Sequence, residues 1–166
     1  MLRKTVFALA LAFAGFAGLP AMAGALQITE ADPVAVVTVP DAWTTAKVKR
    51  GVEIKTPDEE IYIWFELIAP DELEAVQKEH NGYFDKQGVT ITGASETMKQ
   101  EVKGKAWSFT ELKAKSKDGD SIIRYIAINP NVASGKIIMM TYWASPEGHK
   151  THDAAMSAII DSIAYK

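Results

Sequence analysis

The sequence predicts an α+β domain built on a single antiparallel β-sheet of about six or seven strands, with helices packed on its faces. Three observations support this class. Extended apolar segments separated by turn residues fill most of the chain, two stretches have helical periodicity, and residues 61–68 are apolar on both faces of one strand. A strand of that kind lies between two covering layers, so we expect helices on both sides of the sheet.

The first 23 residues have the composition of a cleaved export signal. Arg3 and Lys4 precede an apolar run over residues 5–19, and Ala21-Met22-Ala23 offers the small-x-small pattern that signal peptidase reads. The run is too short for a permanent membrane-spanning helix. We therefore predict cleavage after Ala23, a periplasmic or secreted location in a bacterium, and no stable membrane anchor.

The mature chain is predicted to comprise a flexible lead-in over residues 24–33 and one domain over residues 34–166. The 18 basic and 21 acidic residues become 16 and 21 once Arg3 and Lys4 leave with the signal, a net charge of −5. This mild negative charge gives no reason to expect binding to nucleic acid or anionic lipid. The chain has no cysteine, which excludes disulfides, thiol chemistry and a lipid anchor on cysteine.

The elements follow one another in a simple order. Extended segments are expected at residues 34–39, 48–55, 61–68, 89–93, 97–102, 107–115, 121–128 and 137–144. One helix runs from Pro70 to just before Gly88, and another follows Pro146. Their apolar stripes, spaced near 3.6 residues, are Leu73, Val76, His80, Tyr83 and Phe84 in the first, and Ala155, Met156, Ile159, Ile160 and Ile163 in the second.

Asp118-Gly119 between two extended runs predicts a β-hairpin. A two-residue loop at these positions pairs Leu112 with Tyr125 and sets Lys113 against Arg124. Like charges directly opposite each other are unfavourable, so the charges argue against this register.

Four segments, in this order, resemble the PsbP-like and DcrB-like α/β/α sandwiches. They are Val39-Pro40-Asp41-Ala42-Trp43, Arg124 with Asn129 five residues on, the run from Lys136 to Ala144, and Ile159-Ile160-Asp161-Ser162-Ile163. The resemblance covers about residues 34–166, with Ala42 where glycine is usual. It implies an exported protein that binds or helps to assemble other proteins. These are turn and core positions, so the resemblance carries no site residue across.

His149 and His152 are the candidate metal ligands, since a spacing of three residues places both imidazoles on one helical face. A zinc or copper site needs further ligands, and His80 falls on the core stripe of the other helix. Solvated side chains at a helix start are the favoured interpretation, and no metal or cofactor is predicted.

Motifs that would indicate catalysis are missing from the sequence. It has no Gly-x-Ser-x-Gly elbow, no Walker or dinucleotide glycine pattern, and no spaced oxygen series for calcium. We therefore predict that the protein is not an enzyme.

Two surfaces are candidates for binding a partner. Glu111, Lys113, Lys115 and Lys117 alternate along one strand face, with Arg124 across from them. An edge strand protected by lysines is the favoured interpretation, and a docking patch of Lys113, Lys115 and Arg124 is the alternative. Trp43 and Trp107 lie near strand starts, where an exposed pair would line a groove for a peptide or an apolar ligand.

These observations favour a monomeric, non-enzymatic periplasmic module that binds another protein. The second hypothesis is a carrier of a small ligand or lipid, which requires an apolar pocket between a helix and the sheet.

Overall fold

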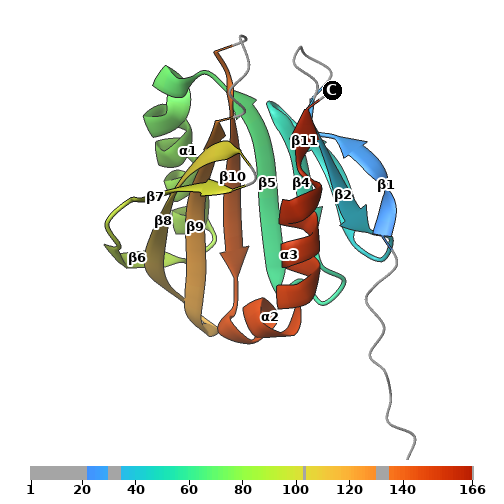
Figure 1. The fold of residues 1–166 in the computed structure, drawn as a ribbon. Helices are drawn as coiled ribbons and strands as arrows, with labels where there is room; N and C mark the ends of the chain where they lie inside the picture. The colour runs from blue at the N-terminus through green and yellow to red at the C-terminus, as the bar shows by residue number, and fades with distance from the viewer. Residues whose placement is uncertain (1–21, 30–34, 103, 130–134, 166) are drawn as a thin grey trace, which may run out of the picture.

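The computed structural model describes residues 22–29, 35–102, 104–129 and 135–165 (Figure 1). The strands are β1 (Met22–Gln27), β2 (Ala35–Pro40), β3 (Thr44–Val48), β4 (Gly51–Lys55), β5 (Ile61–Ile68), β6 (Thr90–Ala94), β7 (Met98–Val102), β8 (Lys105–Ser116), β9 (Gly119–Asn129), β10 (Ile137–Ala144) and β11 (Ala164–Tyr165). The helices are η1 (Pro70–Glu72), α1 (Leu73–Lys86), α2 (Pro146–Thr151) and α3 (Asp153–Ser162). No helix within these residues is long and apolar enough to cross a membrane.

The main sheet is antiparallel and larger than the six or seven strands predicted. In the described part of the chain it has eight strands, in the order β3-β4-β5-β10-β9-β8, with β6 and β7 both pairing with the outer edge of β8. The single strand expected at residues 48–55 is wrong. Residues 44–55 form the β3–β4 hairpin instead, because Lys49 and Arg50 make a turn between the paired Val48 and Gly51.

A second sheet of three strands, β1-β2-β11, lies beside the main one and was not predicted. β2 was expected in the main sheet but pairs with β1 and β11. The flexible lead-in predicted for residues 24–33 is wrong for residues 24–29, because residues 24–27 lie in β1 and the buried Ile28 continues the pairing through its N–H to Ala35 O, at 2.7 Å. Residues 30–33 of that lead-in and residues 1–21 of the predicted signal lie outside the described residues.

The helices cover both faces of the main sheet, as the two-sided apolar pattern of residues 61–68 predicts. α1 packs on one face and α3, together with β2, on the other (Figure 1). β5 and β10 run side by side at the centre and are buried over almost their whole length. Their alternate residues divide between two apolar clusters, one under α1 and one under α3.

The predicted helical stripes are confirmed in their main members. Val76, His80 and Phe84 of α1 are buried, whereas Tyr83 is 38% exposed. Ala155, Met156 and Ile159 of α3 are buried in the same way. The C-terminal helical region is divided at His152 into α2 and α3, and the Ser145 side chain caps α2 by accepting a hydrogen bond from the Gly148 N–H at 2.9 Å.

The β8–β9 hairpin is confirmed, but its predicted register is wrong by two residues. Ser116 pairs with Gly119, so the loop consists of Lys117 and Asp118. Arg124 therefore faces Glu111 rather than Lys113, and its Nε lies 2.8 Å from Glu111 Oε2. This register replaces two opposed cations by an ion pair, which is the physical reason for the shift.

Candidate binding groove and buried polar cluster

Trp43 and Trp107 do not form the exposed pair that was expected. They are 8% and 6% exposed, and both belong to the apolar cluster under α3. Trp43 packs edge-on against His152, with ring centroids 5.6 Å apart. The predicted exposure of the pair is wrong because both indoles pack in the core, which is the usual place for large aromatic rings on strands. Trp107 nevertheless contributes to the lining of a surface cavity, described below as the outer part of a groove.

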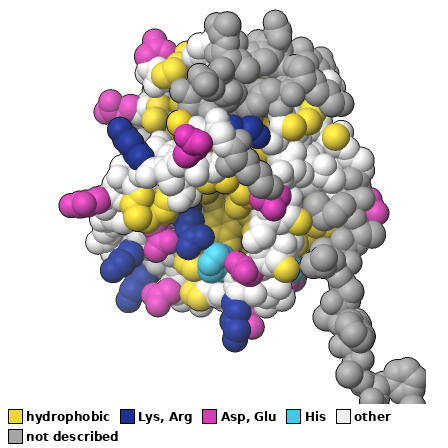
Figure 2. All heavy atoms as spheres, viewed as in Figure 1, with side chains coloured by type: hydrophobic (Ala, Val, Ile, Leu, Met, Phe, Trp, Pro, Cys, Tyr) yellow, Lys and Arg dark blue, Asp and Glu magenta, His cyan; other side chains and the backbone are white. Residues whose placement is uncertain are grey.

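The basic strand face is only partly a cationic surface. Lys113 and Lys115 of β8 are exposed, whereas the guanidinium of Arg124 is paired with Glu111 and lies over the ring of Tyr142. Figure 2 shows Lys and Arg side chains alternating with Asp and Glu on this side of the molecule, rather than gathered in one patch. Partner binding by Lys113, Lys115 and Arg124 stays a prediction.

His149 and His152 each have their own partner. His149 Nδ1 lies 3.0 Å from the Tyr142 hydroxyl, and His152 Nε2 lies 2.7 Å from Asp58 Oδ2. Because α2 ends before His152, the two residues do not share one continuous helical face. No group of three potential metal ligands occurs among the described residues.

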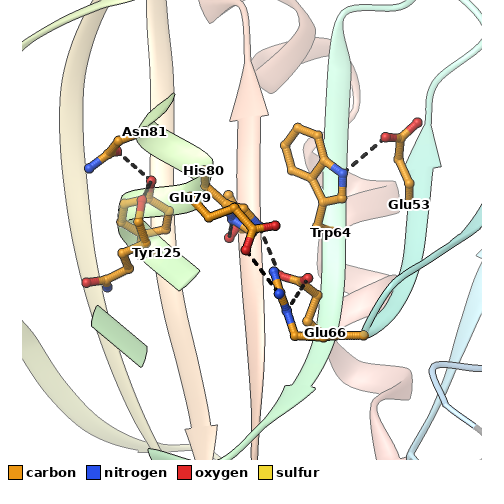
Figure 3. Close-up of polar contacts among 10 residues, drawn as sticks. Glu53, Trp64, Glu66, Glu79, His80, Asn81 and Tyr125 are labelled. Carbon is orange, nitrogen blue, oxygen red and sulfur yellow. Dashed lines mark hydrogen bonds and ion pairs between the residues drawn. The ribbon is translucent and has the colours of Figure 1, made fainter. Parts of the chain in front are cut away.

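A buried carboxylate joins α1 to the sheet. Glu66 of β5 is 3% exposed and accepts a hydrogen bond from Arg50 Nε at 2.9 Å (Figure 3). Its Oε2 lies 3.0 Å from Nε2 of His80 on α1. The imidazole approaches the carboxylate closely, but Glu66 Oε2 is buried without a hydrogen-bond partner among the described residues. Arg50 also donates to Glu79 of α1 at 3.1 Å, and the guanidinium lowers the pKa of that carboxyl.

His80 completes a hydroxyl–imidazole–carboxylate chain, because its Nδ1 lies 2.9 Å from Thr141 Oγ1. This arrangement has the composition of a nucleophilic triad. Thr141 has no exposed surface, however, so a substrate cannot reach its hydroxyl. The chain Thr141–His80–Glu66 therefore fastens α1 to β10 and β5.

Tyr125 makes a second polar connection between α1 and the sheet. Its hydroxyl donates to Asn81 Oδ1 at 2.7 Å and lies 3.3 Å from the carbonyl oxygen of Gln77 (Figure 3). Burial raises the pKa of this phenol, so it remains a neutral donor at physiological pH. Together with Glu66 and His80, Tyr125 fixes the distance between α1 and β9.

A groove opens beside this connection, between α1 on one side and β6 and β7 on the other. Its inner part is a cavity of about 420 Å³ without a charged residue in its lining. The polar groups there are hydroxyls and amides, and the apolar surface comes from leucine, isoleucine and alanine. The lining residues include Leu73, Gln77, Asn81, Thr110, Leu112 and Ala127.

The groove continues toward β7 as an outer cavity of about 550 Å³, which shares Leu73, Ser108 and Ala127 with the inner one. Pro70 and Ile137 add apolar surface there, and Lys99 and Glu101 of β7 bring the charged groups to this end. We call the two cavities together the α1 groove. Its floor follows β8 from Ala106 to Leu112, about 20 Å at the usual rise per residue of a strand.

Sequence reasoning missed the α1 groove, although one signal for it exists. Ala106, Ser108 and Thr110 lie at alternate positions of β8, on the face toward α1. A strand face that packs against a helix normally has larger apolar side chains. Small side chains at these positions leave space above β8. That space becomes a groove because α1 lies over β5 and β10 and forms one of its walls. The role of Glu66 was also missed, because it is a single polar residue in an otherwise apolar strand.

Comparison with known proteins supports the fold. No protein-family model matches the sequence, and no curated protein sequence matches it. The solution structure of cyanobacterial PsbP (CyanoP) from Synechocystis sp. PCC 6803 is similar, with a TM-score of 0.58 and 13% identity, over 94% of this chain and 99% of that one. A protein of unknown function from Pseudomonas aeruginosa, PA94, described as a putative regulator, has a TM-score of 0.40 and 14% identity, over 88% and 98%. The strand and helix order together with the first comparison show that this chain has a PsbP-like fold.

Proposed function

We propose that the protein is a non-enzymatic binding module of the periplasm, and that it holds an extended, uncharged segment of a partner protein in the α1 groove. The observation that carries the proposal is the uncharged inner cavity between α1 and β6–β9. Charged residues make up 23% of this chain, so an uncharged cavity on its surface favours neutral occupants.

The chemistry of the lining favours a polypeptide. Ser108 and Thr110 on the floor, with Gln77 on the wall, supply both donors and acceptors for peptide groups. Leu73 and Ala127 provide the apolar contacts for small side chains. A sugar-binding site would offer the exposed face of an aromatic ring. The aromatic residues of the groove, Tyr125 in the inner cavity and Trp107 in the outer one, are each only 6% exposed.

The dimensions agree with a short extended segment. Both edges of β8 are already paired over the length of the groove, so a partner cannot add to the sheet there. It must lie across the side chains instead. A floor of about 20 Å accommodates about six residues of extended polypeptide.

A selection from random heptapeptides displayed on phage tests the proposal. We expect enrichment of sequences without charge at their central positions, and binding of the synthesised peptides in fluorescence anisotropy. Thr110→Trp fills the inner cavity and should weaken binding at least about tenfold, or about 1.4 kcal/mol. Thr45→Trp, on the exposed strand β3, is the matched control and should have no effect.

Failure to enrich any peptide, or equal binding by the two tryptophan variants, would contradict the proposal. Thermal melts of both variants establish that each is folded. Binding of a small neutral metabolite in the groove, displaced by Thr110→Trp, would instead support the small-ligand alternative.

The periplasmic location in this proposal depends on the predicted signal. Cleavage after Ala23 would leave the pairs of Ala25, Leu26 and Gln27 with β2 intact. It would remove Met22, whose pairing with Pro40 lies beyond an irregularity in the ladder. N-terminal sequencing of the exported protein should give Gly24 as the first residue, and a chain that begins at Met1 would overturn the assignment.

A further inference from the structure

The two sides of the outer part of the α1 groove differ in their chemistry. Pro70 and Leu73, together with Ile137 of β10, make one side apolar. On the other side, β7 contributes Lys99 and Glu101, the charged residues of this lining within the described part of the chain. The lining of the inner cavity has no charged residue. Charge therefore enters the groove at its outer end and along the β7 side.

Lys99 and Glu101 are both available to a partner. Lys99 pairs in the backbone ladder with Ser108, which also lines the inner cavity. Glu101 pairs with Ala106, at the outer end of the floor. Both side chains are exposed, and within the described residues neither has a side-chain hydrogen bond or an ion pair, with the other or with a further residue. No bonded neighbour offsets either charge.

The spacing of these two charges equals the side-chain repeat of an extended polypeptide. Lys99 and Glu101 are two residues apart on one strand, which is about 7 Å. An occupant that lies extended along β8 presents alternate side chains to one side of the groove with the same repeat, and the side chain between them to the other side. Two alternate residues therefore face β7, and the residue between them faces the apolar side at Pro70 and Ile137.

We propose that the segment bound in the α1 groove ends, over the outer cavity, in an acidic–apolar–basic series. The acidic residue lies beside Lys99 and next to the uncharged part of the segment, and the basic residue lies beside Glu101 at the outer end. The apolar residue between them enters the cavity of about 550 Å³. This inference rests on the proposed peptide binding and adds the order of charges that the groove selects, because the reversed order sets like charges against each other.

Peptides of opposite charge order test the proposal. Four uncharged residues, taken from a peptide selected on the wild-type protein, are extended at either end so that glutamate lies next to them, leucine follows and lysine is outermost. The matched probe exchanges glutamate and lysine and so keeps the composition and the net charge. At the end that binds better, we expect the first peptide to bind about fivefold more tightly in fluorescence anisotropy. Added salt should reduce this ratio, because Lys99 and Glu101 are exposed.

An exchange of the two charges on the protein assigns the effect to β7. Lys99→Glu/Glu101→Lys should prefer the peptide of exchanged order, again about fivefold. Lys117→Glu/Asp120→Lys is the control, because it exchanges a cation and an anion at exposed positions of the β8–β9 hairpin, outside the lining of the groove. It should keep the preference of the wild type. Thermal melts establish that both variants are folded.

The outcomes separate this inference from the proposed function. If uncharged peptides bind in the α1 groove but both charge orders bind equally at both ends, the inference is wrong and peptide binding stands. The same conclusion follows if Lys99→Glu/Glu101→Lys keeps the preference of the wild type. If no peptide binds in the groove, the inference and the proposed function are both wrong.

Discussion

Replacing Glu66 by glutamine removes the buried charge on which Arg50 and His80 converge. The wild-type carboxylate is 3% exposed and lies 2.9 Å from Arg50 Nε and 3.0 Å from His80 Nε2. Glutamine has nearly the same volume, so the change leaves no cavity. It keeps one acceptor oxygen and replaces the other by an NH₂ group, which cannot accept from either partner.

The expected loss of stability follows from burial and from the remaining partners. Removing one member of a buried ion pair costs about 3–5 kcal/mol when the other member is left without compensation. Here Arg50 keeps Glu79 at 3.1 Å, and its side chain is 16% exposed. The retained oxygen of glutamine can still accept the hydrogen bond from Arg50 Nε. We therefore expect a loss of about 2 kcal/mol in the free energy of unfolding.

Glu79→Gln is the matched control, because it removes the other carboxylate from the same guanidinium. Glu79 is 59% exposed, so its loss should cost less than about 0.5 kcal/mol. Urea denaturation followed by tryptophan fluorescence measures both variants. In thermal melts, about 2 kcal/mol corresponds to a decrease of about 6 °C in Tm for a domain of this size.

Equal losses in the two variants would refute the reasoning, because burial would then not decide the strength of the contact. A loss below about 0.5 kcal/mol for Glu66→Gln would show that the buried cluster does not hold α1 on the sheet.

Three further changes test other parts of the structure. The Thr56 hydroxyl, and after it His152, lower the pKa of Asp58 to about 2. The carboxylate of Asp58 therefore stabilises the fold fully above its unfolded pKa near 4 and loses this effect as the pH falls through about 2. Asp58→Asn should be less stable than wild type at pH 6. The loss should stay below about 1 kcal/mol because the Asp58 side chain is 45% exposed. The difference in urea midpoint between the two proteins should decrease toward pH 2. Gly51→Ala should lose more than about 2 kcal/mol, since a Cβ there would lie 1.9 Å from the Phe65 carbonyl oxygen, whereas Gly93→Ala, with nothing within 4 Å, should stay within about 0.5 kcal/mol. Ile159→Asp places an unpaired charge at a fully buried position and should lose more than about 4 kcal/mol of stability or fail to fold. Lys115→Ala, at an exposed position, should change stability by less than about 0.5 kcal/mol. Similar losses in the two variants would mean that the buried faces are misassigned.

Local patterns in the sequence predicted the elements that depend on a single periodicity. The strand predicted at residues 61–68 has the same bounds as β5, and the strand predicted at 137–144 has the same bounds as β10. Both are apolar at almost every position, and only a central strand covered on two sides can bury such a segment. The apolar stripes of α1 and α3 were also predicted, because helical spacing places their apolar residues on one face.

Local patterns did not predict which strands pair with each other. β2 and β8 both have the composition of strands, yet β2 leaves the main sheet to pair with β1 and β11. The register of β8 against β9 depends on the pairing of Glu111 with Arg124 as well as on the turn. Both outcomes depend on contacts between residues that are distant in the sequence, and local strand propensity does not predict such contacts.

The sequence alone determined the class of this protein: an α+β chain with a two-sided central strand, two helical regions, no cysteine and no catalytic motif. The tertiary structure decided which side chains meet. It buried Trp43 and Trp107, brought Arg50, Glu66 and His80 together from three elements, and set small residues of β8 beside α1 to form a groove. The physical reason is that periodicity states which face of an element is buried, whereas sites form between elements whose relative placement is set by the packing of the whole core.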